Sequence, residues 1–289
     1  MKFRKLGRTG LKVSEIGFGT EHLLRKSRKT VIEIIKEAIN HDINYFDIVF
    51  NISEYVENIS NAIKEHRDQI ILTCHLGGIE IDGKHKISRN TKLCEETFLK
   101  ILSIFGTDYV DLINLQYVKE REFNNIISPG GLLDLAKKLQ KEGKANFIGI
   151  STHSIDVGQK AIKIGIFDMI MNQVNLVNHY QPGKKELLEA CTKEKVGFVA
   201  MKPFARGNLL QSNKTVNIAS YHTGGVRLTK KIPSDITPVK CLSYVLSHEG
   251  VSTTIPGVKN VQELQENLAY LHASEEEKDF KYLLEEFKI

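Results

Sequence analysis

Two residues with complementary chemistry, Asp47 and His75, lie toward the ends of consecutive apolar stretches, residues 44–50 (NYFDIVF) and 69–75 (QIILTCH). If these stretches are neighbouring strands, the carboxylate of Asp47 can accept a hydrogen bond from His75, fix its tautomer and favour its protonated form. His75 would then be able to act as a general acid. The alternative is an ordinary polar pair that supports a loop.

Polar residues and glycines follow other apolar stretches in the same way. They are Gly19, Thr20, Gln116, Ser151, His153, Gln173, Asn175, Lys202, Pro256 and Gly257. Each one alone could be a turn or cap residue. An acid, imidazoles, amides and an ammonium group around one rim together indicate a functional pocket.

Eight stretches with the character of strands would position these residues. They cover residues 14–20, 44–50, 69–75, 109–116, 145–152, 168–175, 196–202 and 251–257. Because they are apolar nearly throughout instead of alternating, they are typical of parallel strands buried on both faces.

Amphipathic segments separate the predicted strands. In residues 28–41 the apolar positions Val31, Ile34, Ile35 and Ala38 follow the helical i, i+3, i+4, i+7 spacing. Residues 130–144 and 237–250 are two more predicted helices, the second with Thr237 as N-cap and a proline at its first position.

Eight strand–helix units without a linker predict an α/β fold, a (β/α)8 TIM barrel that forms one domain over residues 1–289. We expect an N-terminal β-hairpin in residues 2–13 across the barrel floor, a long loop over residues 206–236, and an extra C-terminal helix over residues 274–289. A doubly wound sheet is the alternative. It is disfavoured because His22 stands where the third glycine of G-x-G-x-x-G belongs.

Composition excludes several classes of protein. The formal net charge of +5 is a mild excess without a dense basic block, so we expect no nucleic-acid partner. The four cysteines stand far apart, which predicts buried, reduced thiols and no metal site. The N-terminal residues lack the apolar core of a signal peptide, and no apolar run reaches the roughly 18 residues that span a membrane, so we expect a cytoplasmic protein. The polar residues around the predicted pocket indicate a small-molecule substrate.

Several longer motifs resemble one known family, the aldo-keto reductases. They are FRKLGRTGLKVSEIGFGT, INYFDI, TDYVDLINLQ, FIGIST, MKPFARGNLL and VLSHEGVSTTIPGVKNVQELQENL. The resemblance runs along nearly the whole chain. It implies a TIM barrel that binds NADPH in an extended form and reduces aldehydes or ketones by hydride transfer.

The resemblance also implies a set of cofactor-binding residues. Ser151 and Gln173 would hold the nicotinamide amide, with Gly19, Thr20, Pro256 and Gly257 nearby; Lys202, Pro203, Phe204 and Arg206 would bind the pyrophosphate; Lys259 and Asn260 would receive the 2′-phosphate, and Glu266 and Asn267 the adenine. Met201 stands where the family has a stacking tyrosine, and Glu263 is a carboxylate that would repel a 2′-phosphate. Lys259 makes NADP(H) the expected cofactor, and Glu263 leaves NAD(H) as the alternative.

The catalytic tetrad of the family, Asp, Tyr, Lys and His, is mostly replaced. Asp47 matches, but Ile52 stands at the Tyr position, His75 at the Lys position and Gln116 at the His position. Tyr55 could supply the missing phenol, or it could be an aromatic residue that packs at the start of a helix. In the latter case His75 is the best remaining acid, because an imidazole needs no neighbouring cation to act at neutral pH.

The segments TCHLGG and STHSIDVGQ resemble a branch of the family with histidine at the lysine position. Members of that branch often carry a C-terminal cysteine-rich segment for iron–sulfur clusters, and no such cysteines occur in this sequence.

Three functions are consistent with these residues. The first is an NADP(H)-dependent oxidoreductase with an altered acid. The second is a lyase or isomerase in which His75, Lys202 or His153 abstracts a proton, and the third is a nucleotide-binding barrel without catalysis. Polar residues in loops 77–90, 117–129 and 206–236 hint at a polar or anionic substrate, among them Lys84, His85, Lys119, Arg121, Tyr221 and His222. The oligomeric state stays open.

Overall fold

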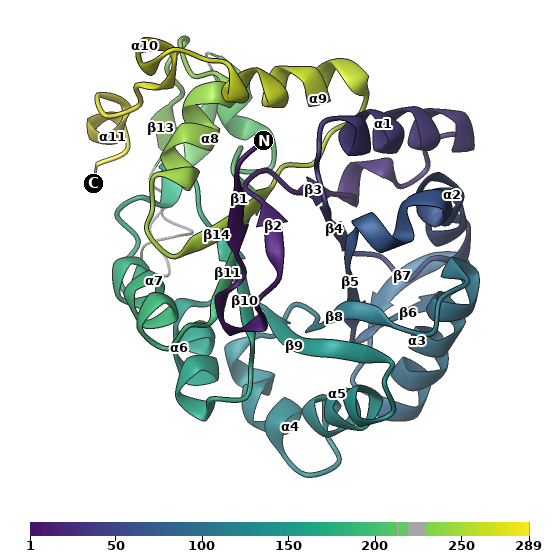
Figure 1. Cartoon of the computed structure of the whole chain (residues 1–289). Helices are drawn as coiled ribbons and strands as arrows, with labels where there is room; N and C mark the ends of the chain where they lie inside the picture. Colours follow the sequence, from purple (N-terminus) through teal and green to yellow (C-terminus); the bar gives the residue numbers. More distant parts are fainter. Residues whose placement is uncertain (213, 219–228, 289) are drawn as a thin grey trace.

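Eight parallel strands form a barrel that helices surround (Figure 1). The computed structural model describes residues 1–212, 214–218 and 229–288. The strands, in their order around the sheet, are β14 (Val251–Ile255), β11 (Gly197–Met201), β10 (Met169–Gln173), β9 (Ala145–Ser151), β8 (Val110–Leu115), β5 (Ile71–Leu76), β4 (Tyr45–Ile48) and β3 (Phe18–Gly19). Parallel bridges from Ile16 to Thr254 and from Gly19 to Gly257 join the last strand to the first. The predicted TIM barrel is confirmed.

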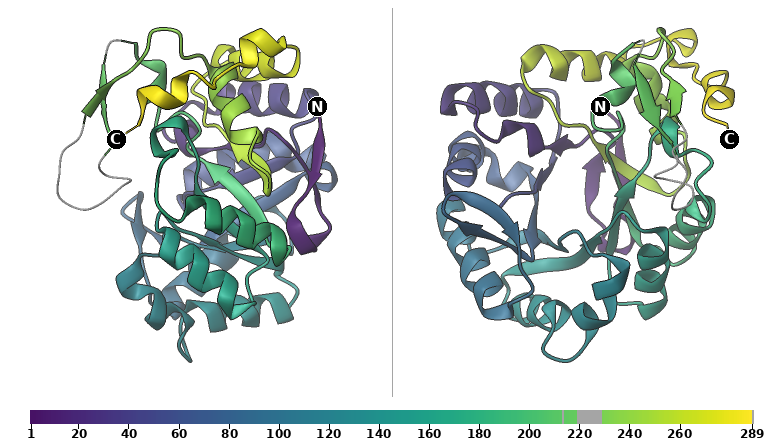
Figure 2. Two further views of the ribbon diagram at one scale, coloured as in Figure 1. Left: turned by 90° about the vertical axis from the view of Figure 1, so that its left-hand side faces the viewer. Right: turned by 180° about the vertical axis from the view of Figure 1, so that it is seen from behind.

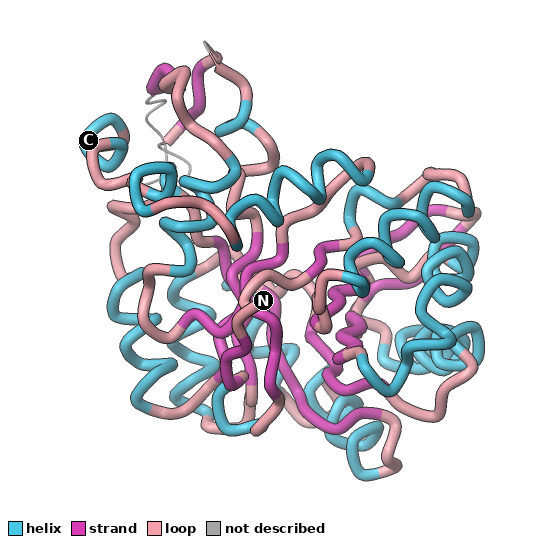
Figure 3. The backbone as a smooth tube through the Cα atoms, turned by 45° about the horizontal axis from the view of Figure 1, so that its top comes forward, coloured by secondary structure: helices cyan, strands magenta, loops and turns pink. Residues whose placement is uncertain are grey.

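The helices that follow these strands in the chain are α1 (Arg28–Asn40), α2 (Ser53–Ile63), α3 (Thr91–Phe105), α4 (Phe123–Ile127), α5 (Leu132–Lys141), α6 (Ile155–Ile164), α7 (Lys184–Lys193), α8 (Pro238–Leu246) and α9 (Val261–Leu268). The four apolar positions predicted for α1 are all buried. The side chain of Thr237 caps α8 by accepting from the backbone N–H of Lys240, as predicted. Figure 3 shows the strands at the centre with the helices around them.

Side chains alternate between the inside and the outside of the barrel along each strand. On β4, Tyr45 belongs to an interior cluster with Ile71, Leu112 and Val199, whereas Phe46 belongs to the core between strands and helices. Every second residue beyond Tyr45 and Ile71 therefore points inward, including those at the strand ends.

The predicted N-terminal hairpin consists of β1 (Phe3–Lys5) and β2 (Lys12–Ser14), paired antiparallel. It closes one end of the barrel by placing Leu6 and Val13 in the interior cluster. The backbones approach closely there, since a Cβ on Gly7 would lie 2.2 Å from the backbone nitrogen of Gly197. An active site must therefore lie at the other end of the barrel.

Two segments that read as loops form strand pairs instead. Residues 77–90 contain β6 (Gly78–Ile81) and β7 (Lys84–Ile87), which pair antiparallel beside β5 (Figure 1). Asp82 and Gly83 both have positive φ, the turn that an Asp-Gly pair favours. In the long loop, β12 (Thr215–Asn217) pairs with β13 (Thr229–Lys231) at the end of the barrel opposite the N-terminal hairpin (Figure 2). Tyr221 and His222 lie outside the described residues.

The prediction of one C-terminal helix over residues 274–289 is wrong. The structure has two short helices, α10 (Glu275–Lys278) and α11 (Leu283–Glu286). Asp279 between them is extended, and its side chain accepts from the backbone N–H of Lys281, a local hydrogen bond that competes with the helix. Leu283 and Phe287 are then free to pack into the core.

Candidate active site

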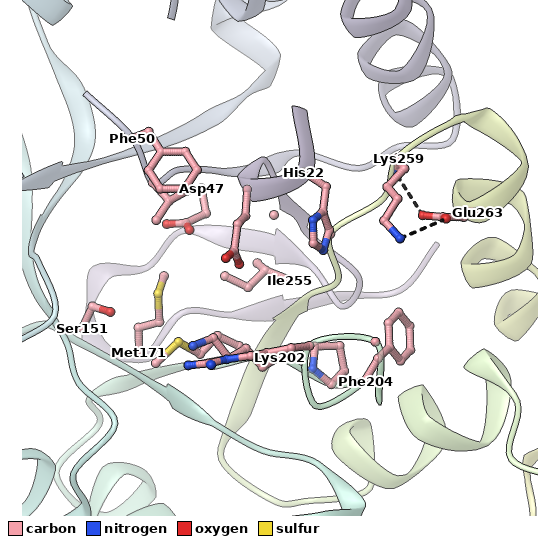
Figure 4. Close-up of a pocket in the computed structure, with 18 of the residues that line it drawn as sticks. His22, Asp47, Phe50, Ser151, Met171, Lys202, Phe204, Ile255, Lys259 and Glu263 are labelled. Carbon is pink, nitrogen blue, oxygen red and sulfur yellow. Dashed lines mark hydrogen bonds and ion pairs between the residues drawn. The ribbon is translucent and has the colours of Figure 1, made fainter. Parts of the chain in front are cut away.

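A cavity of about 590 Å³ lies at the barrel end away from the N-terminal hairpin, a volume typical of small-molecule sites. The last inward-pointing side chains of several strands line it: Asp47, His75, Gln116, Ser151, Met201 and Ile255. Figure 4 shows Asp47 and Ser151 on one side of the cavity and Lys259 and Glu263 on the other. The cavity is thus long enough to join the strand ends to the start of α9.

Most residues predicted for the site line this cavity. Besides Asp47, His75, Gln116 and Ser151 they are Gly19, Lys202, Pro203, Phe204, Arg206, Gly257, Lys259, Glu266 and Asn267. Five predicted residues are not among its lining: Thr20, Tyr55, Gln173, Pro256 and Asn260. Met171, Tyr117 and His153 line it as well, although only His153 stands out in the sequence.

Asp47 and His75 meet as their strand positions predict. The Nε2 atom of His75 lies 2.8 Å from Oδ1 of Asp47, and both residues are buried, at 2% and 4% exposure. The other ring nitrogen, Nδ1, is buried without a hydrogen-bond partner among the described residues. A carboxylate that orients one ring nitrogen and leaves the other without a protein partner is an arrangement that supports proton transfer.

Tyr55 points away from the cavity. Its hydroxyl hydrogen-bonds to Oγ1 of Thr20, and Oγ1 in turn donates to the backbone carbonyl of Asp47. Because threonine has one hydroxyl proton, the phenol must donate its own to Thr20. The ring packs edge-on against Phe50, and burial raises the pKa of Tyr55 well above its usual value. The geometry therefore favours His75 over Tyr55 as the proton donor.

Gln116 lies at the end of β8, in the interior row above Leu112 and Asn114. Its Nε2 donates to the backbone carbonyl of Val49 at 2.7 Å, and its Oε1 is buried without a partner among the described residues. His85, which the hairpin β6–β7 carries, lines the same part of the cavity. In the sequence His85 stands out only as a polar residue of loop 77–90; the Asp-Gly turn that builds the hairpin was the available signal for its position.

A cationic wall faces these groups. Nζ of Lys202 lies 2.8 Å from Nε2 of His153, with Arg206 nearby. Burial, with a smaller contribution from Arg206, lowers the pKa of Lys202 to about 8. Burial and then Lys202 lower the pKa of His153 to about 3, so its neutral ring accepts a hydrogen bond at Nε2 from the Lys202 ammonium group.

The backbone after β11 is unusual. Lys202, Ala205 and Arg206 all have positive φ, at 59°, 47° and 62°. Non-glycine residues adopt this conformation at a cost, and such strain gathers at ligand sites. The strained turn directs Lys202 and Arg206 toward the cavity, where they can contact an anionic group.

The far end of the cavity lies at the start of α9. The side chain of Asn260 caps this helix by accepting from the backbone N–H of Glu263, at 2.8 Å. Glu263 accepts from the backbone N–H of Lys259 at 2.8 Å and lies 4.0 Å from its Nζ (Figure 4). The backbone N–H groups of Lys259 and Glu263, which could otherwise attract a phosphate, therefore already have partners. Asn267 is buried, and its Nδ2 has no partner in the part of the chain that the structure describes.

The four cysteines are buried free thiols, as expected. Within residues 1–212, 214–218 and 229–288, no cluster of three or more His, Cys, Asp or Glu side chains is arranged to hold a metal ion. No described helix combines the length and apolarity that crossing a bilayer requires.

Comparison with known proteins identifies relatives in sequence and in structure. The chain is 27% identical to the "Uncharacterized oxidoreductase YqkF" of Bacillus subtilis, over 94% of this chain and 92% of that protein. It is 25% identical to an L-galactose dehydrogenase of Arabidopsis thaliana, over 93% and 88%. Among solved structures, the holo form of aldo-keto reductase AKR11C1 from Bacillus halodurans superposes with a TM-score of 0.77 at 23% identity, covering 96% of this chain and 94% of that one. The model of the Aldo/keto reductase family matches residues 15–286, and the chain therefore belongs to that family of oxidoreductases.

Proposed function

We propose that this protein transfers a hydride between a nicotinamide dinucleotide and a carbonyl or alcohol substrate, and that His75 exchanges the proton. The observation that carries the proposal is the buried Asp47–His75 pair, which lines a cavity that continues to α9 and leaves Nδ1 of His75 without a partner among the described residues. Relatives named L-galactose dehydrogenase and L-glyceraldehyde 3-phosphate reductase support this class of reaction.

The residues along the cavity suit a dinucleotide. Lys202 and Arg206 offer positive charge midway for a pyrophosphate, and the unpaired Nδ2 of Asn267 offers a donor to a purine ring. Met201 provides an apolar thioether where the nicotinamide ring would pack. The dinucleotide, when bound, supplies or accepts the hydride.

The residues of the chain handle the proton. In the reducing direction, the Nδ1–H of His75 donates to the substrate oxygen, and the imidazole becomes neutral. Asp47 keeps its hydrogen bond with the Nε2–H throughout, so the ring holds its orientation before and after the transfer. In the oxidising direction, neutral Nδ1 accepts the hydroxyl proton.

The choice between NADP(H) and NAD(H) depends on two opposed charges. Lys259 attracts a 2′-phosphate, whereas Glu263 repels it and occupies the backbone N–H of Lys259. Exposed pairs of this kind contribute about 0–1 kcal/mol. We therefore propose that both dinucleotides bind with affinities within about tenfold of each other.

Titration with NADPH and NADH, followed by the fluorescence of the reduced nicotinamide, tests the proposal. The chain contains no tryptophan, so the protein's own emission interferes little. We expect saturable binding of both and oxidation of the bound dinucleotide when a carbonyl substrate is added. Absence of binding by either dinucleotide would overturn the proposed function.

A further inference from the structure

The turn after β11 holds an unfavourable conformation at Lys202. This residue has a φ of 59°, a region that non-glycine residues adopt at a cost. Pro203 follows it, and a proline favours extended backbone at the position before it. Ala205 and Arg206 also have positive φ, at 47° and 62°. Strained residues of this kind persist only where the surrounding structure fixes them, so the contacts of Lys202 indicate what holds the turn.

The carbonyl oxygen of Lys202 accepts two hydrogen bonds. One comes from the backbone N–H of Ala205 at 3.0 Å and lies within the turn. The other comes from Nδ2 of Asn175 at 3.1 Å, in a buried side chain that follows β10. Because β10 pairs with β11, this second bond anchors the strained turn to the neighbouring strand of the barrel.

A second buried asparagine holds Asn175 in place. The backbone N–H of Asn178 donates to Oδ1 of Asn175 at 3.2 Å, and the backbone N–H of Asn175 donates to Oδ1 of Asn178 at 2.9 Å. Asn178 also donates from Nδ2 to the carbonyl oxygen of Gln173 at 3.0 Å and accepts from Nζ of Lys184 at 3.3 Å. The amide of Asn175 is bonded at both ends, so its oxygen faces Asn178 and its nitrogen faces Lys202.

Asn175 is not among the residues that line the cavity, so any effect on a ligand must pass through Lys202. The turn places Lys202 on the wall of the cavity, with its Nζ 2.8 Å from Nε2 of His153 (Figure 4). Burial at this position, with a smaller contribution from Arg206, lowers the pKa of Lys202 to about 8. If the turn relaxed, the ammonium group would move toward water and its pKa would return toward that of an ordinary lysine.

We infer that Asn175, held by Asn178, is a positioning residue for dinucleotide binding, because it fixes the turn that directs the ammonium group of Lys202 into the cavity. The inference rests on the proposed function for the identity of the ligand. Loss of the Asn175 amide should weaken dinucleotide binding. It should leave proton exchange unchanged, since His75 and Asp47 lie on β5 and β4 and pair with each other.

Asn175→Ser tests the bond to Lys202 selectively. A serine hydroxyl can still accept from the backbone N–H of Asn178, but it does not reach the carbonyl of Lys202. We expect the Kd of NADPH and of NADH at pH 7 to rise about tenfold, the loss of one charge-assisted contact. The kcat at saturating dinucleotide should stay within about threefold of wild type. An unchanged Kd would overturn the inference.

The pH dependence of binding distinguishes positioning from a general structural effect. In the wild-type protein the charge of Lys202 is lost between pH 7 and 9, and the Kd should rise over this range. In Asn175→Ser the amine reaches water and keeps its charge to about pH 10, so the Kd should be high but nearly constant from pH 7 to 9. A pH profile parallel to that of wild type would contradict the inference.

The position of Lys202 can also be measured without a dinucleotide. Trace acetylation of the intact protein by acetic anhydride, followed by mass spectrometry of the peptide that contains Lys202, reports the fraction of neutral amine. Half-maximal reactivity should lie near pH 8 in wild type and at about pH 9 or above in Asn175→Ser. Equal midpoints would refute the positioning role. Failure of the proposed function would instead appear as an absence of dinucleotide binding, with the two midpoints still different.

Asn44→Ser is the matched control for stability. Asn44 also bridges two backbone groups, because its Nδ2 donates to the carbonyl of Lys12 at 2.8 Å and its Oδ1 accepts from the N–H of Ser14 at 2.7 Å. These contacts lie at the barrel end closed by the N-terminal hairpin. The dinucleotide Kd of Asn44→Ser should stay within about threefold of wild type. A tenfold increase here as well would assign the effect of Asn175→Ser to stability and not to Lys202.

Ala205→Gly provides a rescue experiment. Glycine adopts positive φ without a steric cost, so a turn with glycine at 205 needs less support from Asn175. Adding Ala205→Gly to Asn175→Ser should reduce the tenfold increase in Kd to about threefold. Asn175→Asp fills the same volume, keeps the cap and loses the same donor, so it replaces the serine variant in these measurements if that variant does not fold. Absence of any rescue by Ala205→Gly would show that Asn175 does not restrain the turn, and the inference would fall.

Discussion

Replacing His75 by glutamine is the most direct test of the proposed chemistry. Alanine would leave the buried carboxylate of Asp47 without a partner, a change that costs several kcal/mol of stability, about 3–5 in comparable pairs. The glutamine side chain has similar reach, and its amide N–H can donate to Asp47. It cannot exchange a proton. His75→Gln therefore removes the acid and keeps the fold.

The expected loss is large because Nδ1 of His75 has no protein partner among the described residues and Tyr55, the other candidate acid, does not line the cavity. General acid catalysis by a positioned side chain contributes about 10²–10⁴-fold, so kcat should fall about 10³-fold, equivalent to roughly 4 kcal/mol of transition-state stabilisation. Steady-state oxidation of NADPH or NADH measures kcat. The dinucleotide Kd, measured by nicotinamide fluorescence, should stay within about threefold of wild type.

Tyr55→Phe is the matched control, because it removes the hydroxyl that could otherwise be the acid. Its kcat should stay within about threefold of wild type, since the phenol does not line the cavity and donates to Thr20. The loss of that buried hydrogen bond should cost about 1 kcal/mol of unfolding free energy. A 10²-fold loss of kcat in Tyr55→Phe, together with an active His75→Gln variant, would refute the assignment.

Three further predictions concern charge. The pKa of Lys202 is lowered to about 8, chiefly by burial. Its positive charge is lost as the pH rises from 7 to 9, so the dinucleotide Kd should increase about tenfold over this range. Lys202→Arg should show no such increase in the same fluorescence titration. Glu263→Gln should lower the Kd for NADPH about threefold and leave the Kd for NADH unchanged. Equal shifts in Kd for both dinucleotides would show that Glu263 does not act on the 2′-phosphate. Burial lowers the pKa of Lys184 to about 7. Between this pH and about 10 the unfolded chain therefore binds a proton that the folded protein does not. The unfolding free energy should rise by a few kcal/mol as the pH increases over this range. Urea denaturation across this range should show the rise in wild type and its loss in Lys184→Met, and parallel curves for the two proteins would contradict the burial of an uncharged lysine.

The sequence predicts the barrel and the Asp47–His75 pair for one physical reason. Parallel strands buried on both faces give apolar stretches that are easy to recognise, and the two-residue period then determines which side chains point inward. Neighbouring strands place their ends on one rim, so the two residues had to lie close together. The observed 2.8 Å contact follows from this geometry.

The same reasoning does not extend to segments outside the strands. Residues 274–289 have a helical composition, but the local hydrogen bond of Asp279 and the burial of Leu283 and Phe287 divide them into two short helices. Residues 77–90 carry an Asp-Gly pair, yet charged residues obscure the alternation that would mark a hairpin. In both segments tertiary packing decides between structures that are similar in local free energy.

Tyr55 and His85 show why the proton donor and its surroundings needed the structure. Tyr55 starts a helix, where a rotation of less than one turn decides whether the phenol meets the cavity or Thr20, and sequence periodicity does not specify that rotation. His85 is ten residues from His75 in the chain, but it reaches the cavity only because Asn51 ties the hairpin to β5. The loss of the tetrad tyrosine at Ile52 therefore need not remove catalysis. The hairpin brings the imidazole of His85 to the same cavity, and in the proposed mechanism His75, paired with Asp47, exchanges the proton.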